Sequence, residues 1–243
     1  MTGSVMNESG GEPPAPKAGY NLLGQRLGRK GQETRERILC AALRLIEESQ
    51  ESSVTLSSVA REAQVGMTTL YLYFPDLGDL VLAVLERVMD YAGSAFGDRL
   101  RAYWPDEELT ECTRGFIRAH HQFWSRHARI LLLRNSFEDT GDARFLQYRN
   151  RVSRPLIELL VRQMDGSCEP MNSPVANCAT VLVTGFERLA TITTNSIFHA
   201  NLREMGMEQV KAYIDDLLDA EAELIALAVR HQRNLARQPE RRN

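Results

Sequence analysis

A run of small, apolar and hydroxyl-bearing side chains over residues 55–74 has the spacing that contact with DNA requires. Thr55 can cap a short helix, and Ala60 is small enough to let a second helix approach the first. Val65 supplies the apolar side chain that closes the turn, and Gly66 can cap the second helix. The pattern predicts a helix-turn-helix, whose second helix presents its N-terminal side chains to the major groove of DNA.

Positive charge is concentrated next to this motif. Residues 20–46 hold six Lys and Arg against two Glu, whereas residues 47–76 hold one Arg against five acidic residues. The whole chain has a formal net charge of −3, so a role in binding nucleic acid needs a local basic patch. We expect that patch to be an arm near the first helix that can follow the minor groove. Its cations are Arg26, Arg29, Lys30 and Arg35.

The elements that must position these residues are helices. Apolar residues recur every three or four positions, and strand-like alternation is absent, which predicts an all-α protein of about nine helices. Ser173-Pro174 is a pair of cap and first helical residue, Asp76 can cap the helix that follows Pro75, and Pro155 should kink or split its helix. The helices are expected over about 33–49, 56–63, 67–74, 77–103, a segment that includes 116–124, 128–137, 143–165, 175–201 and 207–231.

Length and composition exclude several classes of protein. A chain of 243 residues with 43% hydrophobic and 25% charged residues is not largely disordered. No stretch approaches the ~18 consecutive apolar residues of a membrane span, and the first residues resemble neither a secretory signal nor a transit peptide. The four scattered cysteines do not form a disulfide framework. We therefore expect a cytoplasmic protein with reduced thiols and no membrane partner.

The same patterns divide the chain into four parts. Residues 1–25 are rich in Gly, Pro, Ser and Ala and are expected to be a disordered tail. Residues 26–76 form the expected helix-turn-helix domain with its basic arm. Residues 77–235 form a larger helical domain, and residues 236–243 are a short C-terminal tail.

Four segments between residues 33 and 85 carry a more specific pattern. Residues 34–46 read Thr-Arg-Glu-Arg-Ile-Leu-Cys-Ala-Ala-Leu-Arg-Leu-Ile, residues 55–63 and 65–76 follow, and residues 79–84 read Asp-Leu-Val-Leu-Ala-Val. The sequence Leu-Tyr-Leu-Tyr-Phe-Pro directly after a helix-turn-helix is the most distinctive part. On these residues the chain resembles the tetracycline-repressor (TetR) family of bacterial regulators, over roughly a fifth of its length.

The chain departs from the family pattern at three positions. Gln64 stands in the turn where Gly is usual, so it must tolerate a strained or shifted turn. Gly66 replaces the usual Ser cap, and Leu77 stands where Lys is common. These changes remove two expected phosphate contacts, but they leave the expected fold intact.

The resemblance implies which side chains contact DNA. The second helix has no formal charge and so no Arg that could bind guanine bidentately. Its first residues would lie at the floor of the groove with their methyl groups against thymine, and two tyrosines would bond to phosphates. Together with the cap and the arm, the candidate DNA-binding residues are Arg26, Arg29, Lys30, Arg35, Thr55, Met67, Thr68, Thr69, Tyr71 and Tyr73.

The resemblance also implies that residues 77–235 bind a small effector and form a homodimer. The dimer would use the last two long helices, about 174–201 and 207–231, and the helix from Leu77 would connect pocket and helix-turn-helix. The pocket would be lined by aromatic residues and by a polar stripe that runs from Thr180 to Asn195. Its candidate residues are Phe96, Leu100, Phe116, His120, Phe123, Trp124, Phe137, Phe145, Tyr148, Thr184, Glu187 and Thr191.

The expected function is therefore a ligand-responsive, DNA-binding transcriptional regulator. We expect a homodimeric repressor that an apolar or aromatic effector releases from a palindromic operator in double-stranded DNA. An anionic effector such as an acyl-CoA remains an alternative, because arginines recur along the same helices. These are Arg129, Arg134, Arg149, Arg151 and Arg154.

Other functions find less support in the residues. His120, His121 and His127 with Cys112 lack a zinc-binding spacing, and GxSxG, HExxH and phosphate-loop motifs are absent. Neither a metal, a cofactor nor an enzymatic activity is expected. The alternative is a binding module that kept the dimer and pocket but lost operator binding. The uncharged second helix would permit such a loss, but the basic residues near the first helix would then have no role.

Overall fold

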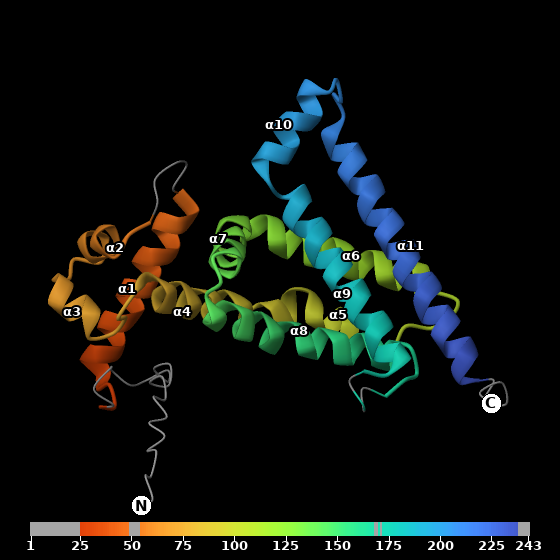
Figure 1. The fold of residues 1–243 in the computed structure, drawn as a ribbon, viewed down its shortest axis with the longest axis horizontal. Coiled ribbons are helices and arrows are strands. Elements are labelled where there is room, and N and C mark those ends of the chain that lie inside the picture. Colours follow the sequence, from red (N-terminus) through yellow and green to blue (C-terminus); the bar gives the residue numbers. More distant parts are fainter. Residues whose placement is uncertain (1–24, 49–53, 168–169, 171, 238–243) are drawn as a thin grey trace, which may run out of the picture. The chain divides into compact units, whose positions relative to one another are not determined.

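The computed structural model describes residues 25–48, 54–167, 170 and 172–237. The expected N-terminal tail therefore lies outside the described residues except for Gln25, and so does the expected C-terminal tail beyond Arg237. Within the described ranges every regular element is a helix, as the periodicity predicts (Figure 1). Among those helices, none combines the length and hydropathy that a membrane crossing would need.

The chain forms two compact units that meet in sequence at Leu80 and Val81. The first unit contains α1 (Arg29–Glu48), α2 (Leu56–Glu62), α3 (Met67–Tyr71) and the beginning of α4 (Leu77–Met89). One face of α1 packs against α2, and α2 packs against α3. The buried residues that hold the three helices together are Ile38, Leu39, Ala42, Val59, Ala60, Leu70 and Phe74.

The second unit is larger and consists of the remainder of α4 and eight further helical segments. The closest packing joins α6 to α11 and α8 to α9, and α9 also packs on α6 and α11 (Figure 1). The segments after α4 are the π-helix η1 (Gly93–Gly97), α5 (Asp98–Arg101), α6 (Leu109–Arg126), α7 (Ala128–Asp139), α8 (Ala143–Gln163), α9 (Pro174–Thr193), α10 (Ser196–Glu204) and α11 (Val210–Ala236).

The long helix expected over 77–103 is interrupted, which corrects the sequence prediction. α4 ends at Met89, and a single π-helical turn, η1, leads into α5. Two glycines, Gly93 and Gly97, flank that turn, and glycine lowers the stability of a regular α-helix. The wider turn lets Phe96 and Leu100 both be buried, so packing compensates for the irregular backbone.

The helix expected over 175–201 is two helices, which is a second correction. α9 ends at Thr193, and the Asn195 side chain accepts a hydrogen bond of 2.8 Å from the Ile197 N–H to cap α10. Thr194 donates its hydroxyl back to the Ala190 carbonyl at 2.7 Å. Side chains that form hydrogen bonds to nearby backbone groups compete with the helical hydrogen bonds and so favour helix ends. Here this effect outweighs the apolar periodicity that continues along the sequence.

Proline and cap positions give a mixed result. Ser173 accepts a hydrogen bond of 3.3 Å from the Ala176 N–H ahead of Pro174, and Asp76 accepts one of 2.9 Å from the Asp79 N–H. Both predicted caps are confirmed. Pro155 lies inside α8, which continues to Gln163, so of the expected kink or split the split is wrong.

Candidate nucleic-acid interface and effector region

α2 begins at a reciprocal cap. The Thr55 hydroxyl accepts a hydrogen bond of 3.2 Å from the Ser58 N–H, and the Ser58 hydroxyl accepts one of 3.1 Å from the Thr55 N–H. This capping box satisfies two backbone donors at the start of a helix that is too short to be stable alone. The capping role of Thr55 is confirmed, while its contact with DNA stays a prediction.

The turn between α2 and α3 is tight and slightly strained. The Val65 N–H donates to the Ala60 carbonyl at 3.0 Å, and Gln64 has a φ of 54°. Positive φ is unfavourable for a residue with a side chain, so Gln64 occupies the conformation that glycine would adopt freely. Gly66 then caps α3 without a side-chain hydrogen bond. The expected strain at the turn is confirmed.

α3 is anchored from one side and open on the other. Leu70 and Phe74 are buried in the unit's core, and the Arg35 guanidinium lies 5.4 Å from the centre of the Phe74 ring. On the opposite side Tyr71 and Leu72 are 46% and 42% exposed. Thr68 is exposed as well, whereas Met67, Thr69 and Tyr73 are half-buried.

Leu72 was missed by the sequence reasoning. The signal that could have revealed it is its position four residues after Thr68, which places both on the same helical face.

The basic residues do not form an arm in the described structure, which is a correction. Arg29 and Lys30 lie in the first turn of α1, and Arg35 lies further along that helix, so only Arg26 precedes it. The Arg29 side chain is 85% exposed and lies 3.8 Å from Glu33. Helix α1 starts four residues earlier than expected, so these cations are presented by a regular helix.

The hydroxyl group of Tyr73 lies beside the same turn of α1. A methyl group placed on Gly31 would lie 3.6 Å from the Tyr73 hydroxyl oxygen. The Tyr73 phenol therefore lies near the first turns of α1, the helix that also carries the exposed Arg29 and Lys30. This combination of hydrogen-bond donors and positive charge suits a phosphate backbone.

Comparison with known proteins finds a match in the first unit and the start of the second. Residues 38–84, which extend from α1 into α4, match the family model described as bacterial regulatory proteins of the tetR family. This segment, about a fifth of the chain, is similar to the tetR family. A solved structure also matches most of the chain in fold, including much of the second unit.

Two groups of relatives illustrate how far the similarity extends. HTH-type transcriptional regulators from Staphylococcus aureus strains USA300 and bovine RF122 are 34% and 28% identical over 85 residues, which are 35% of this chain and 46% of each relative. The chain thus spans less than half the length of these curated relatives. A tetR-family transcriptional regulator from Streptomyces coelicolor matches with a TM-score of 0.54 at 18% identity, over 85% of this chain and 90% of that one. At that identity the match shows a shared fold.

The second unit brings several predicted pocket residues together, but as a packed cluster. Phe96 lies 6.2 Å from Phe116, 5.0 Å from His120 and 5.3 Å from Phe123 between ring centres, mostly edge to face. Phe186, which the sequence reasoning missed, lies 4.7 Å from His120. All five rings are buried, so in this structure they form core.

His120 is uncharged in this core. Burial lowers the pKa of His120 to about 3, with smaller contributions from the charges of His121 and Arg134. Removal of a cation from water is costly, and no acidic group compensates among the causes of the shift.

A second group of predicted residues surrounds a buried ionic network on α7, α8 and α9. Arg134 lies 3.7 Å from Glu138, and Arg149 lies 3.1 Å from Glu138 and 3.7 Å from Glu187. Glu187 also accepts a hydrogen bond of 3.1 Å from Ser153. The four charged groups balance one another, which is the arrangement that buried charges require.

Two buried oxygens in this region, Glu138 Oε1 and the Tyr148 hydroxyl, have no hydrogen-bond partner among the described residues. Tyr148 itself is 4% exposed. Burial raises the pKa of this phenol. A buried hydroxyl without a hydrogen-bond partner carries a desolvation cost. A ligand group that bonds to the Tyr148 hydroxyl would remove this cost and so stabilise the structure.

The other predicted pocket residues occupy different environments. Phe137 stacks on the buried Phe145 with ring centres 4.5 Å apart, and the Arg134 guanidinium lies 5.3 Å from the centre of the Trp124 ring. Leu100 is buried in the core, and Thr191 bonds to the Glu187 carbonyl at 2.9 Å. Thr184 is exposed and bonds to the Thr180 carbonyl, so the structure does not bring it to the cluster.

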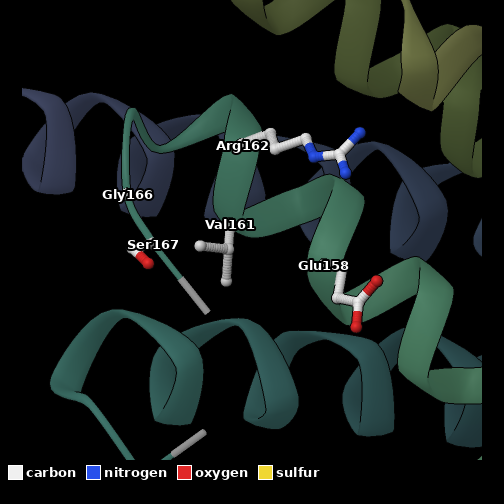
Figure 2. Close-up of a pocket in the computed structure, with 5 residues that line it drawn as sticks. All are labelled: Glu158, Val161, Arg162, Gly166 and Ser167. Carbon is white, nitrogen blue, oxygen red and sulfur yellow. The ribbon is translucent and has the colours of Figure 1, made fainter. Parts of the chain in front are cut away.

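A surface pocket near the end of α8 involves none of the predicted residues. Figure 2 shows it, with Glu158 and Arg162 on one helix and Ser167 on the chain that follows. Val161 and Gly166 complete the lining. Glu158 is already paired with Arg154 at 2.9 Å, so the pocket has no buried, unsatisfied charge that would point to a ligand.

Proposed function

We propose that this chain is a DNA-binding transcriptional regulator, and more specifically a homodimeric repressor that a small effector releases from a palindromic operator. The observation that carries the proposal is α3, a short helix anchored by Leu70 and Phe74 with Thr68, Tyr71 and Leu72 left open to a partner. Exposed Arg29 and Lys30 on α1 supply positive charge within the same unit. These are the two components that DNA recognition needs, base contacts and phosphate contacts.

The decisive experiment is selection of random duplex DNA by the purified protein, followed by binding isotherms at several salt concentrations. We expect an inverted repeat with half-sites separated by about one helical turn, ~34–36 Å, or a multiple of it. Affinity should fall steeply with salt, because phosphate contacts release counterions. If no sequence is enriched even at low salt, the proposal fails and the pocket-only binding module is favoured.

The pocket-only module is kept as a second candidate because of one observation. No Lys or Arg occurs between Glu62 and Glu86, so α3 and both its flanks lack a cation for phosphate contact. Exposed cations on α1 argue in the opposite direction. The same selection experiment separates the two candidates.

Exposed apolar residues on α9 and α11 support the homodimer. Val181 on α9 is 70% exposed, and Leu224 and Leu227 on α11 are each 58% exposed. The two helices pack against each other (Figure 1), so they can contribute to one surface. Exposed apolar side chains on two packed helices favour burial against a second copy.

The dimer can be tested with one double variant. Leu224→Glu combined with Leu227→Glu should give monomers by analytical ultracentrifugation and weaken binding to the full operator. Leu146→Glu is the matched control, because Leu146 is equally exposed but lies on α8. A double variant that remains dimeric would remove this interface from the proposal.

For the effector, the network around Tyr148 offers the best-supported site in the second unit. An apolar or aromatic molecule with one hydrogen-bonding group would satisfy the Tyr148 hydroxyl. An anionic ligand such as an acyl-CoA is less favoured, because Arg134 and Arg149 are already paired with acidic residues. Release follows if the effector prefers a conformation that does not fit the operator.

The effector site can be tested with Tyr148→Phe, which removes only the unpartnered hydroxyl. We expect operator binding to persist, because Tyr148 lies outside the DNA-binding unit. The concentration of effector required for release should rise. An unchanged response would exclude the Tyr148 hydroxyl as an effector contact.

A further inference from the structure

We propose that α3 recognises its half-site through thymine methyl groups, and that it forms no bidentate hydrogen bond to guanine. The proposal rests on the DNA-binding function proposed above and specifies which chemical groups of the operator are recognised. It concerns the open face of α3, defined here as Met67, Thr68, Tyr71 and Leu72.

The open face follows from the way α3 is anchored. Thr68, Tyr71 and Leu72 are exposed and Met67 is half-buried, whereas Leu70 is fully buried. Residues three and four apart share one side of a helix, so Thr68 lies beside both Tyr71 and Leu72. The outermost groups on this face are methyl groups, a thioether, a phenol and one aliphatic hydroxyl.

The chain around α3 lacks the side chains that recognise bases by paired hydrogen bonds. Those side chains are Arg and Lys for guanine, Asn and Gln for adenine, and Asp and Glu for cytosine. From Ala63 to Pro75 the sequence contains none of them except Gln64. Guanine is the base most often recognised in this way, and α3 carries no group for it.

Methyl groups remain as the feature that such a surface can distinguish. In the major groove, thymine alone among the four bases presents a methyl group. The Thr68 methyl and the side chains of Met67 and Leu72 can exclude water from it, which is favourable for apolar surfaces. The Thr68 and Tyr71 hydroxyl groups can bond to bases or phosphates, but a single hydroxyl both donates and accepts and so discriminates poorly.

Recognition of adenine by Gln64 is the alternative that the experiment must distinguish from recognition of thymine methyl groups. Gln64 lies in the turn before α3 with a φ of 54°, and its side chain is exposed. Its amide could bind adenine in a bidentate way. Adenine pairs with thymine, so a preference for A·T pairs alone would not distinguish the two modes.

The first experiment changes the DNA. Once an operator has been selected, each thymine in one half-site is replaced in turn by deoxyuridine, which lacks only the methyl group. We expect a loss of about fourfold in affinity at one or more positions, which corresponds to about 0.8 kcal/mol for a buried methyl group. Replacement of each guanine by 7-deazaguanine, which removes the N7 acceptor, should leave affinity unchanged.

The second experiment changes the protein by single groups. Thr68→Val keeps the methyl group and removes the hydroxyl, whereas Thr68→Ser keeps the hydroxyl and removes the methyl. Both are conservative at an exposed position, so the fold should be retained. We expect Thr68→Val to preserve the preference for thymine over deoxyuridine at its contact position, and Thr68→Ser to abolish it there. Gln64→Ala should leave that preference unchanged.

The outcomes separate this inference from the proposed function. Specific binding that is insensitive to deoxyuridine at every position would overturn methyl recognition and leave operator binding intact. The same holds if 7-deazaguanine causes the main loss, or if only Gln64→Ala changes the preference. Failure to select any operator would overturn both the proposed function and this inference.

Discussion

The two units place their candidate functional residues in opposite ways. In the first unit most of those residues lie on α1 and α3. They are close in sequence to the buried residues that anchor the helices, and Thr68 and Tyr71, for example, flank the buried Leu70. In the second unit the candidates come from helical segments between η1 and α9, and most are buried. A surface site built on one short motif can be inferred from local spacing, whereas a buried site depends on how distant helices meet.

The largest expected effect tests the anchoring of α3. Phe74→Ala should destabilise the first unit by about 3–5 kcal/mol, because a fully buried aromatic ring would be replaced by a cavity. Denaturant unfolding monitored by circular dichroism measures the loss. Thr68→Ala on the exposed face is the matched control and should change stability by less than about 0.5 kcal/mol. Equal losses in the two variants would mean that α3 is not anchored from one side.

A somewhat smaller effect is expected at the ionic network of the second unit. Arg134→Ala should cost about 3 kcal/mol, because it leaves the buried Glu138 carboxylate with a weaker set of partners. Arg126→Ala, an exposed position on α6, serves as the control in the same unfolding assay. If the two substitutions cost the same, the network has no special role in stability.

The buried His120 predicts a dependence of stability on pH. Its pKa is lowered to about 3 in the folded chain, against about 6.5 when unfolded, so the unfolded chain binds the extra proton between these values. The stabilising effect of keeping His120 neutral is therefore present above pH 6.5 and is lost as the pH falls toward 3. Between pH 6 and 5 the loss approaches ~1.4 kcal/mol.

The matching measurement is unfolding of the parent and His120→Gln at pH 7, 6 and 5. The variant should lose less stability over this range, because its side chain does not titrate. His231→Gln, at an exposed site, should behave as the parent does. A parent and a His120→Gln variant with the same pH dependence would show that His120 is accessible to protons in the folded state.

The smallest effect is expected at the exposed cations of α1. Their removal should lower DNA affinity and leave the stability of the fold unchanged. Arg29→Ala with Lys30→Ala should weaken binding to every sequence and reduce the slope of log affinity against log salt by about 0.9 for each lost phosphate contact. Arg37→Ala, at another exposed site of α1, is the control. An unchanged slope in the double variant would remove the start of α1 from the proposed interface.

Local chemistry explains which parts of the fold were predictable. The cap at Thr55 and the turn at Gln64 depend on neighbours within a few residues, and both are as expected. The break at Asn195 was missed because the apolar pattern continues through it, while the deciding hydrogen bond comes from a single side chain.

The aromatic residues show a different limit. Phe116 and His120 were expected to line a pocket, and the structure packs them against Phe96 and Phe186. A ring that lines a cavity and a ring that fills the core have the same periodicity in sequence, because both face inward. The Tyr148 hydroxyl without a hydrogen-bond partner could not be foreseen for the same reason, since periodicity does not show what surrounds a buried side chain.

The stretch from Glu62 to Glu86 without Lys or Arg has a consequence for how the protein would behave in a cell. Counterions are released by contacts with phosphates, and those contacts are common to correct and incorrect sequences. An uncharged α3 adds no ionic contact when the protein moves from a random site to its operator. Absolute affinity would then vary with salt concentration. The ratio of affinity for the operator to affinity for competing genomic sites would stay nearly constant.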